Sequence, residues 1–110
     1  MTDTDPAAPP GEVTIRRYRA EDAPRVKEIT AEAFAAVSID AAVDRRWPGI
    51  VPVPWAERKW ASMAPQIDDQ PEHCWVAEAD GAVVGYVTCD VLAHLRVGRI
   101  PDLAVAQQWR

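Results

Sequence analysis

The sequence predicts a mixed α/β domain of the α+β type, in which helices precede an antiparallel meander of strands. Apolar residues recur at helical spacing between residues 22 and 37, which is typical of an amphipathic helix. Two apolar runs flank Asp80-Gly81, which is the pattern of a β-hairpin. A chain of 110 residues is long enough to bury one hydrophobic core, so we expect one domain.

The first strand and first helix are predicted between residues 13 and 37. In Val13–Tyr18, Val13 and Ile15 alternate with polar residues, as expected for a strand. Asp22 is a suitable N-cap, and Pro24 is tolerated in a first helical turn, where N–H groups have no intrahelical partner. The apolar stripe of this helix comprises Val26, Ile29, Ala33, Phe34 and Val37.

Two further helices are predicted before the next strand. The segment 38–47 has Ser38 as its N-cap, and the prolines of Pro48–Pro54 end it because each removes an N–H donor. A third helix is expected from about Trp55 to Gln66. We expect the apolar sides of both helices to pack in the core; they comprise Ile39, Val43 and Trp47 in one, and Trp55, Trp60, Met63, Ala64 and Ile67 in the other.

The remaining residues predict three strands. Asp-Gly supplies the positive φ angles of a type I′ turn, so Ala79 should face Ala82, and Trp75 should face Tyr86. Both faces of this hairpin are largely apolar, which predicts a central position covered on both sides. A last strand is expected over about Arg99–Val105, where Pro101 indicates a bulge or a late start.

Composition narrows the class of protein. A net charge of −5 provides no basic surface for nucleic acid, and no apolar run is long enough to span a bilayer. The N-terminal residues 1–12 are acidic and proline-rich, unlike a signal peptide, so we expect a disordered tail followed by one domain over 13–110. Two cysteines without a secretion signal indicate free thiols and a cytoplasmic location.

No metal site is predicted. The candidate ligands are His73, Cys74, Cys89 and His94. Adjacent strand residues point to opposite faces, so His73 and Cys74 do not converge, and no CxxC or HxxxH pair is present. In the expected register Cys74 and Cys89 lie diagonally on one face, too far apart for a comfortable disulfide.

Three segments in this order resemble the N-terminal half of the GCN5-related N-acetyltransferase (GNAT) superfamily. They are VTIRRYRAEDAPRVKEI, WVAEADGAVVGYV and DLAVAQQWR. The resemblance implies a half-domain in which a strand, two or three helices and three strands form a mixed, mostly antiparallel sheet with helices packed on it. It also implies that the last segment is the family's fourth strand and its exit.

The resemblance ends at the start of the family's acyl-CoA signature, Arg/Gln-x-x-Gly-x-Gly/Ala. Arg110 falls where the first residue of that signature would stand, so it could contact a phosphate of the cofactor. The glycines that would bring N–H groups to the pyrophosphate do not follow. We therefore expect a domain truncated after its fourth strand, and inactive alone.

The resemblance also implies roles for four residues of the last strand. Main-chain groups of Leu103, Ala104 and Val105 would bond the pantetheine arm of acetyl-CoA, and an N–H near Leu103 would polarise the thioester carbonyl. Asp102 is the candidate general base that accepts a proton from the amine acceptor. From the residues alone, Leu103–Val105 is also explained as a buried strand, and Asp102 as a solvated carboxylate at a strand end.

Two functions remain open at this point. The first is an acyl-CoA-dependent N-acetyltransferase, which uses acetyl-CoA and an amine as substrates and no metal. The second is a non-catalytic half-domain that pairs with a partner chain, or with itself as a homo-oligomer, through the exposed edge of its last strand.

Overall fold

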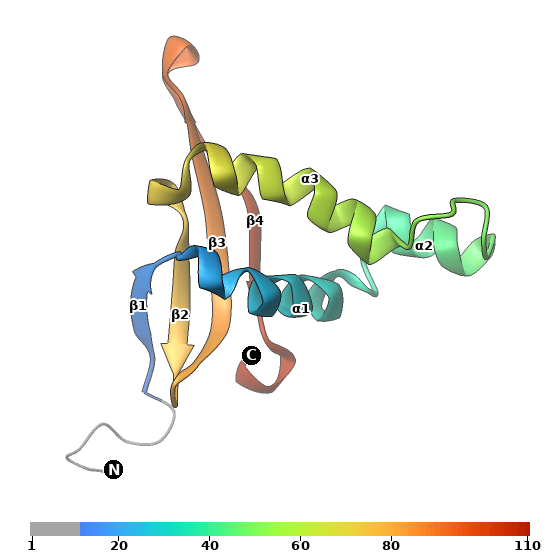
Figure 1. Ribbon diagram of the computed structural model, residues 1–110, viewed down its shortest axis with the longest axis horizontal. Helices are drawn as coiled ribbons and strands as arrows, with labels where there is room; N and C mark the ends of the chain where they lie inside the picture. Colours follow the sequence, from blue (N-terminus) through green and yellow to red (C-terminus); the bar gives the residue numbers. More distant parts are fainter. Residues whose placement is uncertain (1–11) are drawn as a thin grey trace.

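The computed structural model describes residues 12–110, so the predicted tail lies outside the described residues except for Glu12. Three α-helices and four β-strands follow one another in this described part (Figure 1). Their bounds are β1 Thr14–Arg17, α1 Ala23–Phe34, α2 Ile39–Arg46, α3 Trp55–Asp69, β2 Trp75–Ala79, β3 Ala82–Leu92 and β4 Val97–Val105.

The four strands form one sheet in the order β1-β2-β3-β4. Every neighbouring pair is antiparallel, including β1 and β2, which the three helices separate in the chain. The predicted α+β class is therefore confirmed, and the sheet is antiparallel throughout. Within the described residues β4 is an edge strand, as the sequence led us to expect.

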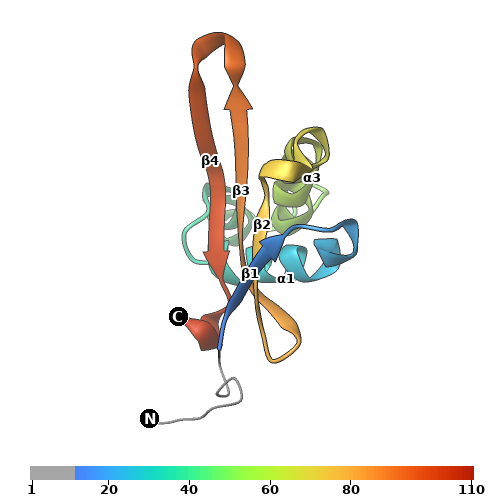
Figure 2. The same ribbon diagram turned by 90° about the vertical axis from the view of Figure 1, so that its left-hand side faces the viewer.

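The helices α1 and α3 cover one face of the sheet. Both lie on the same side of the strands in Figure 2, and both contact β3. The core between them and the sheet is formed by Val26, Ile29, Met63, Val76, Val83, Tyr86, Ala104 and Ala106. The expectation that the hairpin is covered on both faces is wrong for the described residues, because no described helix lies on the opposite face.

The predicted helices are confirmed, but their apolar sides are only partly buried. Val26 and Ile29 of α1 are inaccessible to solvent, whereas Val37 is 73% exposed because α1 ends at Phe34. In α2, Ser38 accepts a hydrogen bond from the Ala41 N–H, as expected of an N-cap. Ala41 is the buried residue of this helix. The predicted core residues Ile39 and Trp47 are exposed: Ile39 is the first residue of α2, and Trp47 follows its last residue, Arg46.

The β2–β3 hairpin has the predicted turn and a different register. Asp80 and Gly81 have φ angles of 52° and 78°, and Ala79 faces Ala82. A bulge near Ala77 and Glu78 then shifts the pairing by one residue, so that Trp75 faces Val87 instead of Tyr86.

Arg25 of α1 supports the bulged segment. Its Nε donates to the Val83 carbonyl at 2.9 Å, which provides a partner for a main-chain group at the irregular part of the ladder. A side chain that lies far away in the sequence therefore bonds the hairpin beside its bulge.

The second hairpin, β3–β4, projects beyond the rest of the sheet (Figure 1). Its pairing is irregular between Thr88 and Asp90, opposite Ile100 and Pro101. Of the two alternatives predicted from Pro101, the structure therefore has the bulge and not the late start, since β4 begins at Val97. Val91 lies beyond Val87, which pairs with the first residue of β2, and the side chain of Gln70 bonds both the N–H and the carbonyl of Val91. These bonds replace a neighbouring strand at that point.

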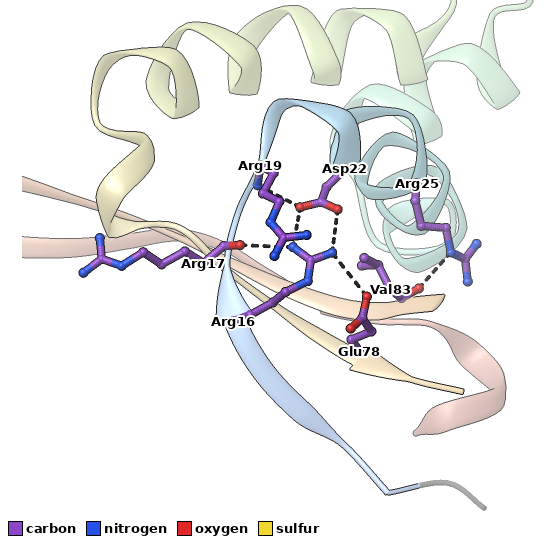
Figure 3. Close-up of polar contacts among 7 residues, drawn as sticks. All are labelled: Arg16, Arg17, Arg19, Asp22, Arg25, Glu78 and Val83. Carbon is purple, nitrogen blue, oxygen red and sulfur yellow. Dashed lines mark hydrogen bonds and ion pairs between the residues drawn. The ribbon is translucent and has the colours of Figure 1, made fainter. Parts of the chain in front are cut away.

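A buried carboxylate joins the first strand to the first helix. Asp22 is 5% exposed and accepts two hydrogen bonds of 2.9 Å from the Arg16 guanidinium (Figure 3). It also accepts the Arg19 N–H at 2.8 Å. Arg16 reaches Glu78 of β2 as well, at 3.4 Å. The hydrogen bonds from Arg16 hold the pKa of Asp22 below its ordinary value.

Replacing Asp22 with alanine should lower the free energy of unfolding by about 3 kcal/mol, because the half-buried Arg16 loses its main partner. Urea unfolding at neutral pH measures this loss. Glu28→Ala is the matched control, since Glu28 pairs with Arg25 on the surface, and it should cost no more than about 0.5 kcal/mol.

Replacing Asp22 with alanine should also make the free energy of unfolding depend less on pH. A lowered pKa in the folded state stabilises the protein above the ordinary aspartate pKa, about 4, and that contribution is lost as the pH falls. The difference between wild type and Asp22→Ala should therefore shrink between neutral pH and acid. A constant difference over that range would contradict the assigned role of Asp22.

Candidate functional site

The N–H and carbonyl groups of β4 point toward β3 at one residue and away from the sheet at the next. The N–H of Ala106 donates to the Val84 carbonyl at 2.8 Å, so Ala106 bonds inward to β3. Because inward and outward groups alternate on an antiparallel edge strand, Ala104 also bonds inward, and the main-chain groups of Leu103 and Val105 point away from the sheet. Of the three residues predicted to bond a pantetheine arm, only Leu103 and Val105 therefore have outward main-chain groups, and the Val105 carbonyl is bonded by Arg110.

Side chains of β4 follow the same alternation. Asp102 and Ala104 are 6% exposed and lie beneath the helices, whereas Leu103 is 64% exposed on the uncovered face. There, Leu103 and Val105 line an apolar hollow of about 140 Å³ together with residues of the other three strands. The hollow is also lined by Ile15, Trp75, Val76, Ala77, Gly85, Tyr86, Val87 and Ala104.

Asp102 forms an ion pair that the sequence did not indicate. Its Oδ1 accepts a hydrogen bond of 2.6 Å from Nζ of Lys59 on α3. The Lys59 ammonium also lies 4.7 Å from the centroid of the Phe34 ring, a cation–π distance. The second oxygen, Oδ2, has no hydrogen-bond partner among the described residues.

Thr88 fixes the backbone of Asp102. Its hydroxyl accepts the Asp102 N–H at 3.1 Å and lies 3.3 Å from the Asp102 carbonyl. The carboxylate is therefore held by β3 through its main chain and by α3 through its side chain. This environment contradicts the alternative interpretation of Asp102 as a solvated carboxylate.

Tyr86 belongs to the core beside this ion pair. Thr30 donates its hydroxyl hydrogen to the Val26 carbonyl at 2.7 Å, so the Tyr86 hydroxyl donates to Thr30 at 2.7 Å. Burial, with a smaller effect from the nearby Asp102 charge, raises the pKa of Tyr86 to about 12. Tyr86 is therefore a buried aromatic residue whose hydroxyl has a hydrogen-bond partner.

The residues after β4 fold back on its outer edge. They form the short 3₁₀ helix η4, Gln107–Trp109, whose first N–H donates to Glu32 of α1 at 2.8 Å. Nε of Arg110 then donates to the Val105 carbonyl at 2.8 Å, which agrees with the outward direction of that carbonyl. Arg110, predicted to contact a phosphate, thus lies at the free edge of β4.

Both cysteines are free thiols in the structure. Burial raises the pKa of the Cys74 thiol. No group of three or more histidine, cysteine, aspartate or glutamate side chains within residues 12–110 is arranged to hold a metal ion. In the same residues, no helix is long and apolar enough to cross a membrane.

Of the site residues predicted from the sequence, Leu103, Val105 and Arg110 lie together at the outer edge of β4, while the side chains of Asp102 and Ala104 are buried beneath the helices. Lys59 was missed, because it precedes Asp102 by 43 residues and no local spacing links the two.

Solved structures share this fold at low sequence identity. The PH1933 protein of Pyrococcus horikoshii OT3 is 12% identical, with a TM-score of 0.65 over 90% of this chain and 61% of that one. The PaiA N-acetyltransferase of Thermoplasma acidophilum, solved with coenzyme A, is 15% identical, with a TM-score of 0.63 over 89% of this chain and 61% of that one. The diaminobutyrate acetyltransferase EctA of Paenibacillus lautus is 21% identical, with a TM-score of 0.59 over 90% of this chain and 49% of that one.

The chain therefore spans about half to three-fifths of the length of these proteins. No curated protein matches it. These comparisons show that the chain has an α+β fold that is also found in N-acetyltransferases. The family model of the acetyltransferase (GNAT) family matches residues 26–110, which is most of the sequence. The chain belongs to the GNAT acetyltransferase family.

Replacing Lys59 with methionine should lower the free energy of unfolding by about 2 kcal/mol, because the buried Asp102 loses its counter-charge. In a double-mutant cycle with Asp102→Asn, the two substitutions should couple by about 1–2 kcal/mol. Lys27→Met is the matched control: Lys27 pairs with the exposed Glu57 and should cost no more than about 0.5 kcal/mol. Equal costs for the two lysines would contradict the structure.

Titration followed by tyrosinate absorbance should show that the two tyrosines of the chain ionise at higher pH than exposed tyrosines do. Burial raises the pKa of Tyr18 as well, and we expect the later step, near pH 12, to disappear in Tyr86→Phe. A raised pKa in the folded state means that stability is lost as the pH rises from about 10 upward. Titration of both residues near their ordinary pKa in folded protein would refute the buried position of Tyr86.

Proposed function

We propose that this chain provides the pantetheine-binding strand and the general base of an acyl-CoA-dependent N-acetyltransferase, which transfers an acetyl group from acetyl-CoA to an amine. The observation that supports this most strongly is the phase of β4. The outward N–H of Leu103 belongs to the peptide unit that joins Asp102 to Leu103. The Asp102 side chain is attached to the Cα atom at the other end of this unit, so an oxyanion donor and a carboxylate lie close together.

Each residue has a defined task in this proposal. The Leu103 N–H would bond the thioester oxygen as negative charge develops there, and the outward N–H of Val105 would orient the pantetheine arm. Asp102 would accept a proton from the amine as its nitrogen attacks the carbonyl carbon. Oδ2 is the oxygen available for this step, because Lys59 bonds Oδ1.

Arg110 would add an electrostatic contact to the cofactor. One of its donors bonds the Val105 carbonyl, and its remaining N–H groups are available for a phosphate. The proposal also retains the cytoplasmic location and the absence of a resident metal that the sequence predicts.

These 110 residues should bind acetyl-CoA weakly and should not turn it over alone. The sequence after β4 contains no Gly-x-Gly loop that would bring N–H groups to a pyrophosphate. Calorimetric titration of acetyl-CoA, together with a free-thiol assay in the presence of amines, measures both quantities. A micromolar dissociation constant with turnover would contradict this part of the proposal.

The contact with the pantetheine arm can be tested without turnover. Titration with S-acetyl pantetheine at millimolar concentration should shift the backbone amide resonances of Leu103 and Val105. The amides of Ala104 and Ala106, which bond inward, serve as internal controls and should shift less. Absence of saturable shifts at Leu103 and Val105 would overturn the assignment of β4 as the cofactor strand, whatever the outcome with acetyl-CoA.

A second candidate function is supported by the uncovered face of the sheet. Ile15 of β1 and Leu103 of β4 are 62% and 64% exposed there. A non-catalytic half-domain could pair with a partner chain or a second copy through this surface. Sedimentation velocity over a range of concentrations distinguishes the candidates: self-association abolished by Leu103→Arg favours pairing, and a monomer at high concentration argues against a homo-oligomer.

A further inference from the structure

Lys27 and Lys59 are the two lysines of this chain, and they offer a natural comparison. Each pairs with a carboxylate through Nζ: Lys27 with Glu57 at 3.0 Å and Lys59 with Asp102 at 2.6 Å. Their surroundings differ strongly. The side chain of Glu57 is 52% exposed, whereas that of Asp102 is 6% exposed.

Lys59 is a primary amine at the position where the proposed reaction needs one. Its Nζ contacts the carboxylate that would act as general base, and that carboxylate belongs to the residue immediately before the outward N–H of Leu103. Packing over the Phe34 ring holds the ammonium in this place. An acceptor amine bound for reaction would need the same contact with Asp102.

We propose that Lys59 is an acetylation site of this chain, modified by an acetyl thioester with Asp102 as its base. This inference rests on the proposed function, since it uses the same carboxylate and strand. Asp102 takes one proton from the Lys59 ammonium, and the free amine attacks the thioester carbonyl carbon. A C–N bond forms, the C–S bond breaks, the thiolate takes the second nitrogen-bound proton, and Asp102 releases its proton to solvent.

The product, Nε-acetyl-lysine, carries no charge. Acetylation therefore breaks the ion pair with Asp102 and leaves the carboxylate without its counter-charge. An incoming primary amine would then meet an unpaired Asp102, so modification of Lys59 would also change the site for a second acceptor.

A purely structural role for the ion pair predicts the opposite order of reactivity. The side chain of Lys59 is 24% exposed and that of Lys27 is 38% exposed, so accessibility alone makes Lys27 the more reactive amine. A general base contributes about 10²–10⁴-fold to such reactions, so even a weakly bound donor should make Lys59 at least about tenfold faster.

The test incubates the 110-residue protein with S-acetyl pantetheine and follows acetylation of both lysines by site-resolved mass spectrometry. Lys59 should react at least about tenfold faster than Lys27, and Asp102→Asn should abolish this preference. Glu57→Gln is the matched control, and it should leave the rate at Lys59 unchanged. Circular dichroism establishes that each variant is folded. If Asp102→Asn does not fold, the ratio of the two rates in the wild-type protein decides.

Repeating the experiment with acetic anhydride separates the two proposals, because this donor acetylates amines without a pantetheine arm that β4 could bind. Preference for Lys59 with the thioester alone supports both this inference and the role of β4. Preference with both donors supports activation of Lys59 by Asp102 and contradicts the role of β4 in binding pantetheine. A ratio of one or less with the thioester, or a preference that persists in folded Asp102→Asn, overturns the inference.

Discussion

Side chains and main-chain groups of β4 alternate in direction from one residue to the next, and the rest of the site depends on this alternation. Once the Ala106 N–H bonds the Val84 carbonyl, the directions of every neighbouring group follow. Asp102 and Ala104 must lie beneath the helices and bond inward. The side chains of Leu103 and Val105 must lie on the uncovered face, and their main-chain groups must point away from β3. A shift of one residue would bury Leu103 and place the carboxylate on the uncovered face, away from Lys59.

The elements of this fold are predictable from the sequence because their signals are local. The helical spacing of Val26 and Ile29 identifies α1, and Asp80-Gly81 identifies the hairpin, since few residues adopt positive φ at two successive positions. Pro101 indicated the irregularity in β4 for an equally local reason, because proline provides no N–H for the ladder. The strand that carries the candidate site was also recognised, through its resemblance to the family.

Other features were not predictable because they depend on distant contacts. The bulge that changes the β2–β3 register is supported by Arg25 of α1, and no pattern within the hairpin indicates it. Apolar residues on both faces of the hairpin suggested two covering layers, yet α1 and α3 lie on one face of the described sheet (Figure 2). The Lys59–Asp102 ion pair joins α3 to β4 and therefore exists only once both have packed on the same face.

Hydrogen exchange at individual amides of β4 tests this account most directly. The N–H groups of Ala104 and Ala106 bond β3 and should be protected, whereas those of Leu103 and Val105 point away from the sheet and should exchange rapidly. Alternating protection along the strand is the predicted result. Uniform protection from Leu103 to Ala106, or protection of Leu103 and Val105 alone, would contradict the phase of β4 and with it the proposed site.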